Sequence, residues 1–135
     1  MSVSFINKLF KSKSNDDFCT AVVLAAGNSQ RMGKDKILMP LGGAPVIAHT
    51  LKALQSAECI DEIVVVTKYE RLQELADICH DHGISKASKV VVGGKTRLES
   101  SLIGVSNADE RAKYIAIHDG ARPFVTNSLI ERVVH

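Results

Sequence analysis

The chain has 135 residues, of which 45% are hydrophobic and 4% aromatic, so a single domain with an aliphatic core is expected. Its 17 basic and 15 acidic residues give a net charge of +2, which is too balanced for nucleic acid or an anionic membrane to be the principal partner. The three cysteines form no C-x-x-C pair and lie in or beside apolar segments, which predicts buried thiols in a cytoplasmic protein.

Residues 1–17 differ from the rest of the chain. Their few apolar side chains are interrupted by Lys8, and the stretch is too short for a secretory signal or a membrane span. A basic amphipathic turn resting on a membrane surface is the alternative that this composition leaves open. We expect a loosely ordered leader over residues 1–17, followed by a domain over residues 18–135.

From Cys19 onward, apolar runs of strand length alternate with helical patterns. The runs are rich in Val and Ile and do not alternate with polar residues, which is typical of strands covered on both faces. Strands are predicted at Thr20–Ala25, Glu62–Thr67, Lys89–Val92 and Lys113–His118.

Helices are predicted between these strands. The first begins at Pro45, and the second ends before Gly83, which suits the left-handed residue that often follows a helix. The third begins with the capping box Thr96-x-x-Glu99 and continues through the apolar residues Leu98, Leu102, Ile103 and Val105.

A fourth helix is predicted to begin near residues 126–128, with Leu129, Ile130, Val133 and Val134 facing inward. The alternation of strand and helix predicts an α/β fold, a Rossmann-like three-layer sandwich with a mostly parallel sheet. Because the pattern stops within the fourth helix, we expect the chain to be the front part of a larger domain.

The first predicted strand leads into the turn Ala25-Ala26-Gly27-Asn28-Ser29-Gln30-Arg31-Met32-Gly33. A glycine allows the backbone to approach a ligand closely, and Arg31 supplies a permanent positive charge, so the turn predicts a phosphate site. The spacing excludes a P-loop, because Met32 stands where the second glycine is needed. It also excludes the dinucleotide fingerprint, because Ser29 and Met32 occupy glycine positions.

Two further polar turns follow predicted strands. Gly93-Gly94-Lys95-Thr96-Arg97, with Ser100 and Ser101 in the next helix, follows the third strand, and His118-Asp119-Gly120-Ala121-Arg122-Pro123 ends the fourth. Ligands of such sheets bind beyond the carboxyl ends of the strands, so three polar turns at this edge predict one shared site.

Several of these residues have an equally plain structural role. Gly93 and Gly94 fit a bulge or a close backbone approach, and Asp119 fits either a Mg²⁺ ligand or a cap of its own turn through Arg122. His118 is expected to be a packed strand residue. In the segment Cys79–His82 only two of the possible ligands share a helical face, so it is interpreted as a polar helix end and not as a zinc site.

Together these motifs resemble the 2-C-methyl-D-erythritol 4-phosphate cytidylyltransferase family. The resemblance runs from Thr20 to about Val134 and depends on three motifs: Leu24–Gly33 with Lys36, Gly93–Ser100 and His118–Pro123. The first motif is equally similar to nucleotidyltransferases that act on molybdopterin. The other two are similar to cytidylyltransferases of the methylerythritol and ribitol phosphate type.

The resemblance implies roles for the residues of the first motif. The backbone of Ala25, Ala26 and Gly27 would contact the base and phosphates. Arg31 and Lys36 would be the catalytic cations that hold the triphosphate and stabilise charge at the α-phosphorus. Lys36 departs from the family in its flanking residues, which here are Asp35 and Ile37 where Pro and Gln are frequent.

It also implies roles for the second and third motifs. These are cytosine recognition by Gly94 and Ser100 with support from Arg97, a metal site at Asp119, a ribose contact at Gly120, and a contact of Arg122 with the sugar phosphate or with its own loop.

The implied reaction is attack by the phosphate of 2-C-methyl-D-erythritol 4-phosphate on the α-phosphorus of CTP, with Mg²⁺ or another divalent cation and release of pyrophosphate. The implied partners are CTP and a sugar-alcohol phosphate, and the full-length family protein would be a homodimer. The family continues beyond the part matched here, so we expect this chain to hold the nucleotide half and to be inactive or impaired alone. The alternatives are a ribitol phosphate cytidylyltransferase, a molybdopterin nucleotidyltransferase, and a nucleotide-binding fragment without turnover.

Overall fold

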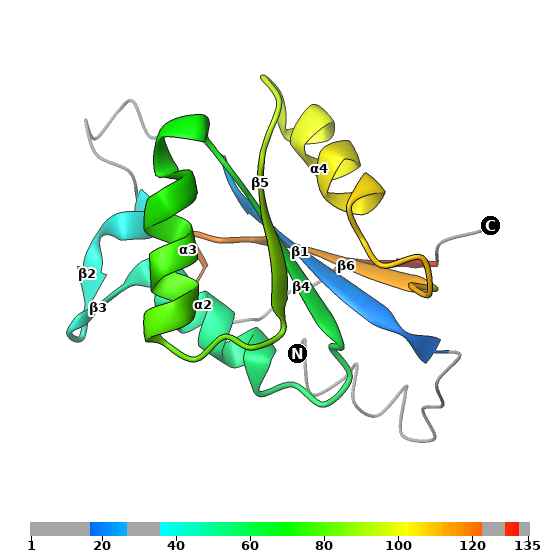
Figure 1. Cartoon of the computed structure of the whole chain (residues 1–135), viewed down its shortest axis with the longest axis horizontal. Helices are drawn as coiled ribbons and strands as arrows, with labels where there is room; N and C mark the ends of the chain where they lie inside the picture. Colours follow the sequence, from blue (N-terminus) through cyan, green and yellow to red (C-terminus); the bar gives the residue numbers. More distant parts are fainter. Residues whose placement is uncertain (1–16, 27–35, 123–128, 133–135) are drawn as a thin grey trace.

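A computed structural model of the chain describes residues 17–26, 36–122 and 129–132. Its centre is a five-stranded sheet with the order β5-β4-β1-β6-β7 (Figure 1). The four parallel strands are β1 (Cys19–Ala25), β4 (Glu62–Thr67), β5 (Ala87–Val92) and β6 (Tyr114–Asp119). The four strands predicted from the sequence are therefore confirmed, with shifts of one or two residues at their ends.

The register of the sheet brings the carboxyl ends of its strands to one edge. Leu24 of β1 pairs with Asp119 of β6, and Ala25 pairs with Thr67 of β4. Thr67 pairs in turn with Val92 of β5. The loops that follow β1, β5 and β6 therefore begin close to the same edge of the sheet.

The predicted fourth helix is wrong in the part that the structure describes. Residues Leu129–Arg132 form a strand, β7, which pairs antiparallel with β6. A partner at this position satisfies backbone groups of β6 that would otherwise lie at an open sheet edge, which is a stronger requirement than a short helical pattern. The remaining residues of the predicted helix lie outside the described residues.

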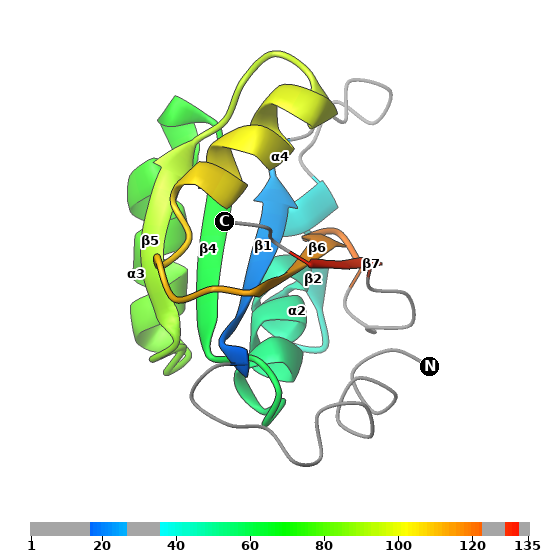
Figure 2. The ribbon, with the colours of Figure 1, turned by 90° about the vertical axis from the view of Figure 1, so that its right-hand side faces the viewer.

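Within the described residues, three helices form the outer layers of the sandwich. The helices α2 (Val46–Gln55) and α3 (Leu72–Asp81) cover one face of the sheet, and α4 (Arg97–Ser106) covers the other (Figure 2). Alternate residues of β1 separate the two cores: Val23 packs in the α2–α3 cluster, whereas Val22 packs in the cluster on the α4 side. This is the three-layer α/β sandwich predicted from the sequence.

The three helices begin and end close to their predicted bounds. Pro45 is the N-cap of α2, and Thr96 is the N-cap of α4, whose hydroxyl accepts a hydrogen bond from the Glu99 amide. At the end of α3, Gly83 has a φ of 68°. The amide of Ile84 donates to the Cys79 carbonyl at 2.9 Å, which is the long bond of a Schellman motif.

Only part of the apolar pattern that marks α4 in the sequence faces the sheet, where Val105 packs against the cluster around Val22. Leu98 and Leu102 are 69% and 59% exposed, whereas Ser100, Ser101 and Gly104 are buried. A Cβ atom at Gly104 would lie 2.3 Å from a methyl group of Val22. The helix therefore packs closely on the sheet through its small residues, a feature that an apolar periodicity does not predict.

A short hairpin precedes α2. Its strands β2 (Pro40–Leu41) and β3 (Ala44–Pro45) are joined by Gly42 and Gly43, whose φ values of 60° and 88° favour glycine. Single turns of 3-10 helix, η3 (Lys36–Leu38) and η4 (Tyr69–Arg71), precede the hairpin and α3.

The three cysteines are buried thiols that form no disulfide bond, as predicted. Within the described ranges, no helix has the length and apolar character needed to cross a membrane.

Candidate functional site

A cleft of about 330 Å³ lies at the carboxyl edge of the sheet. Its walls come from the three segments that the sequence singled out: Leu24 and Ala26 at the end of β1, Gly94, Lys95, Thr96, Arg97 and Ser100 around the start of α4, and Asp119 at the end of β6. The predicted convergence of three polar turns at one edge is therefore observed for the parts of them that the structure describes.

Gly93 lets the β5–α4 loop pass close to the sheet. Its amide donates to the Thr67 carbonyl at 2.8 Å, so the first residue of the loop after β5 is still hydrogen-bonded to β4. A Cβ atom here would lie 2.6 Å from Ser100 Oγ, 2.9 Å from a Val66 methyl carbon and 3.0 Å from the Ala26 Cβ. Of the two interpretations open for this glycine, the structure supports the close backbone approach.

The first turn of α4 holds the rest of this loop in place. Ser100 Oγ accepts a hydrogen bond from the Gly94 amide at 3.1 Å, and Glu99 Oε1 accepts one from the Lys95 amide at 2.7 Å. Thr96 Oγ1 accepts from the Glu99 amide at 3.0 Å. The capping box predicted from the sequence is present in altered form, since the Glu99 carboxylate binds the amide before the cap and not that of the cap itself.

The wall formed by this loop is cationic. Lys95 and Arg97 line the cleft on this side, and of the described residues only Asp119 adds a carboxylate to the lining. Two cations against one carboxylate favour an anionic ligand.

Asp119 forms the opposite wall and shapes its own turn. Its Oδ1 accepts a hydrogen bond from the Ala121 amide at 2.9 Å, and its Oδ2 lies 3.9 Å from Nε of Arg122. The turn-capping role that the sequence leaves open for Asp119 is therefore observed. Each carboxylate oxygen has a second lone pair, so these contacts leave coordination sites at the cleft.

Gly120 fills a position without room for a side chain. Its amide donates to the Leu24 carbonyl at 2.9 Å, which ties the end of β6 to the end of β1. A Cβ atom would lie 2.7 Å from Ile47 and 3.1 Å from the Leu24 carbonyl oxygen. The glycine therefore permits close packing of the turn, and it is buried and is not among the residues that line the cleft.

The other predicted site residues are only partly placed. Gly27 and Arg31 lie outside the described residues. Ala25 is buried at the end of β1, and its carbonyl accepts a hydrogen bond from the Thr67 hydroxyl at 3.2 Å. Lys36 is exposed at the start of η3 and is not among the residues lining the cleft.

Sequence reasoning assigned Lys95 no role and Thr96 only that of a helix cap, although both line the cleft. Their position in the polar turn, between Gly94 and Arg97, could have indicated that they line the same cleft. It also missed Thr50 of α2, whose buried hydroxyl contacts the turn after Asp119. No motif marks that threonine, because its role depends on the packing of a helix distant in sequence.

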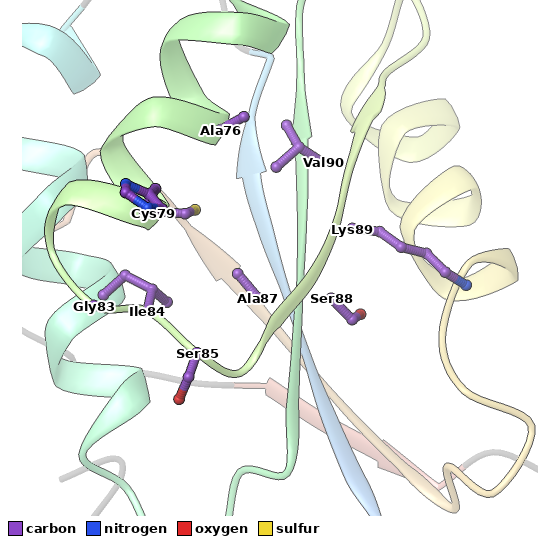
Figure 3. A pocket seen from close by; sticks show the side chains of 10 residues that line it. Ala76, Cys79, Gly83, Ile84, Ser85, Ala87, Ser88, Lys89 and Val90 are labelled. Atoms are coloured by element: carbon purple, nitrogen blue, oxygen red, sulfur yellow. The ribbon is translucent and has the colours of Figure 1, made fainter.

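A second hollow, of about 410 Å³, lies between the end of α3 and β5 (Figure 3). It contains Cys79, whose thiol has its pKa raised by burial and is therefore protonated at neutral pH. His80 and Asp81 are exposed there, so the segment Cys79–His82 forms a polar helix end as interpreted above. None of the residues that bind the loops of the first cleft lines this hollow.

No group of three or more His, Cys, Asp or Glu side chains within the described ranges is placed to hold a metal ion. Asp119 nevertheless fits a hard divalent cation that takes most of its ligands from phosphate and water, which is how Mg²⁺ is often held in nucleotide sites.

Comparison with known proteins agrees with these motifs. The model of the family described as 2-C-methyl-D-erythritol 4-phosphate cytidylyltransferase matches residues 19–135. The enzyme of that name from Clostridium tetani is 37% identical over 114 residues, which cover 83% of this chain and 46% of the relative. That from Halalkalibacterium halodurans is 37% identical over 117 residues, covering 85% and 51%.

Solved structures share the fold. The 4-diphosphocytidyl-2C-methyl-D-erythritol synthase of Anaerococcus prevotii is 27% identical with a TM-score of 0.68, over 81% of this chain and 46% of that one. Rv0371C of Mycobacterium tuberculosis, solved as a complex with manganese, is 24% identical with a TM-score of 0.58, over 78% and 52%. The latter is a likeness of fold alone.

The chain thus spans about half the length of the curated relatives that it matches. The match includes the three motifs, and the described parts of all three contribute to the walls of the cleft. This chain belongs to the 2-C-methyl-D-erythritol 4-phosphate cytidylyltransferase family.

Proposed function

We propose that the cleft at the carboxyl edge of the sheet binds CTP, and that the complete enzyme transfers the cytidylyl group to 2-C-methyl-D-erythritol 4-phosphate. The observation that carries this proposal is the convergence of β1, the β5–α4 loop and β6 on one cleft with a cationic wall. The names of the relatives supply the substrate class.

In this proposal the β5–α4 loop, which the first turn of α4 fixes by hydrogen bonds, recognises cytosine. Ser100 Oγ already accepts the Gly94 amide, so its own proton is available to donate to an acceptor on the base. Gly94 leaves no space for a side chain, because a Cβ atom would lie 2.5 Å from that of Glu99. Arg97, at the first position of α4, lines the cleft beside them.

The phosphates are held by charge. Arg31 and Lys36 bind the triphosphate, and Asp119 holds a divalent cation, Mg²⁺ by preference, which neutralises phosphate charge when bound. The acceptor phosphate is itself an anion, so no nucleophilic side chain is needed. Its oxygen attacks the α-phosphorus in line and pyrophosphate leaves, while the cationic residues stabilise the charge that develops.

Titration calorimetry of this chain with CTP and Mg²⁺ tests the binding step. We expect one site for CTP, weaker binding of GTP, and a loss of Mg²⁺-dependent affinity in Asp119→Asn. Asp81→Asn is the matched control, because Asp81 is exposed at the end of α3 beside the second hollow. Equal affinity for CTP and GTP, or an unchanged Asp119→Asn variant, would contradict the proposal.

Turnover is tested in the full-length enzyme. We expect Arg31→Ala and Lys36→Ala each to lower the rate at least tenfold, since loss of one charge-stabilising contact costs about 3 kcal/mol in the transition state. Pyrophosphate release with CTP or GTP and with methylerythritol or ribitol phosphate as acceptor identifies the substrates. The same assay on this chain separates binding from transfer.

A further inference from the structure

Two buried side chains bind the turn from Asp119 to Arg122: Thr50, which belongs to no motif, and His118, which begins the third motif. The Thr50 hydroxyl of α2 lies 3.0 Å from the Gly120 carbonyl oxygen and 2.9 Å from that of Arg122. His118 Nε2 lies 3.2 Å from the same Arg122 oxygen. Both side chains are buried, with exposed fractions of 0% for Thr50 and 2% for His118.

These contacts fix which groups donate. A carbonyl oxygen only accepts, so Thr50 donates its proton to the two carbonyls, and His118 must carry a proton on Nε2. The Nδ1 atom of His118 is buried, and no group within the described ranges forms a hydrogen bond with it. An unprotonated Nδ1 leaves a lone pair unmatched there, whereas a proton on that atom would leave a buried N–H donor unmatched in its place.

The Arg122 carbonyl uses both of its lone pairs on these buried donors. Two further hydrogen bonds are made within the turn itself. The Arg122 amide donates to the Asp119 carbonyl at 3.2 Å, and the Ala121 amide donates to the Asp119 carboxylate at 2.9 Å. The bonds within the turn are thus accepted by Asp119 at its first position. Thr50 and His118 bind the carbonyl of Arg122 at its last position and so anchor the turn to the α2 side of the sheet.

We propose that Thr50 and His118 are positioning residues that hold the Asp119–Arg122 turn, and so keep the Asp119 carboxylate directed at the cleft. Neither touches the ligand. The consequence for CTP depends on the function proposed above, whereas the anchoring of the turn does not.

Thr50→Val tests the anchor, because valine has the shape of threonine without its hydroxyl. Hydrogen exchange of the Ala121 and Arg122 amides is expected to accelerate about tenfold more than that of Val64 and Val65 in the central sheet, which report global unfolding. Thr50→Ser keeps a hydroxyl and is expected to restore slow exchange. Equal acceleration at the turn and in the central sheet would overturn the proposal.

The ring of His118 provides a test without mutation. Nitrogen-15 chemical shifts of the wild-type imidazole are expected to show a protonated Nε2. An unprotonated Nε2 could not donate to Arg122 and would overturn the role of His118.

Calorimetry with CTP and Mg²⁺ connects the anchor to the site. We expect Thr50→Val to bind about tenfold more weakly than the wild type and Thr50→Ser to recover most of the affinity, a difference of about 1.4 kcal/mol for tenfold. If the wild-type chain does not bind CTP, the proposed function fails and the exchange experiment alone decides the anchor. If it binds and Thr50→Val binds equally well, the positioning role fails.

Discussion

Ser100 shows how a single buried hydroxyl organises a loop. Its Oγ accepts the Gly94 amide at 3.1 Å, and its side chain is 4% exposed. We expect Ser100→Ala to lower the free energy of unfolding by about 1 kcal/mol, because the partly buried Gly94 amide loses its acceptor. Urea denaturation measures this change. Ser101→Ala is the control, since Ser101 is buried on the same helix without a bond to the loop, and an equal loss in both variants would contradict the assignment.

Asp109 gives the chain a pH-dependent contact at the opposite end of the sheet. Hydrogen bonds from the Arg111 side chain and amide lower the pKa of Asp109 from 3.8 to about 2. A carboxyl group with a lower pKa in the folded state stabilises the fold while it is ionised. Its contribution is therefore complete above about pH 4 and is lost as the pH falls through about 2.

We expect Asp109→Asn to unfold at lower urea concentration than the wild type near pH 6, with the difference disappearing as the pH approaches 2. The pair is exposed, so the difference should be small and should shrink in high salt. Denaturation midpoints of the two proteins across this pH range measure it. A difference that persists unchanged at pH 2 would contradict the assignment to the ionised carboxylate of Asp109.

The residues of the site that the sequence predicted are mostly those whose partners lie close to them along the chain. Asp119 and its contact with Arg122 were predicted, because both belong to one short turn. His118 was correctly interpreted as a packed strand residue, as its 2% exposure shows. The role of Thr50 was not predicted, because Thr50 comes from a helix 72 residues away from Arg122. The bond of His118 to the Arg122 carbonyl was also missed, although it spans only four residues.

At the scale of elements, the four parallel strands were predictable because each is a continuous Val- and Ile-rich run. The face of α4 was not, because its close contact with the sheet is made by Ser100, Ser101 and Gly104. The segment Leu129–Arg132 forms β7 although its short apolar pattern fits a helix. The segment forms a strand because it pairs with β6, and the periodicity of a local sequence carries no information about such a partner.

Gly104 allows a direct prediction about the packing of α4. Alanine has the higher helix propensity by about 1 kcal/mol, yet the new Cβ would lie 2.3 Å from a methyl group of Val22 in the core. We expect Gly104→Ala to destabilise the protein by about 1–2 kcal/mol in urea denaturation, because overpacking outweighs propensity.

Two variants control for this explanation. Leu102→Ala changes a residue of the same helix that is 59% exposed and should alter stability by less than about 0.5 kcal/mol. Val22→Ala, combined with Gly104→Ala, removes the methyl groups in conflict. The free energy of unfolding should fall by less in the double variant than the sum of the decreases in the two single variants. Strictly additive decreases would contradict a steric conflict.

On the scale of the whole molecule, the sheet register is what turns three separate motifs into one site. Leu24 pairs with Asp119 and Thr67 with Val92, so the pairing of the strands holds the segments that form the walls of the cleft in place. A ligand that fills the cleft would contact all three segments at once. It would therefore stabilise the folded state as a unit, by an amount set by its concentration relative to its dissociation constant.

We expect CTP with Mg²⁺, at one hundred times its dissociation constant, to raise the free energy of unfolding by about 2.7 kcal/mol, with GTP giving less. Hydrogen exchange at lower occupancy locates the site. The amides of Gly94, Lys95 and Ala121 should gain protection together, because they belong to the two loops on opposite walls of the cleft. The Ile84 amide, which closes the turn beside the second hollow, should be unchanged. Protection at Ile84 instead, or on only one of the two loops, would show that the nucleotide does not bind between them.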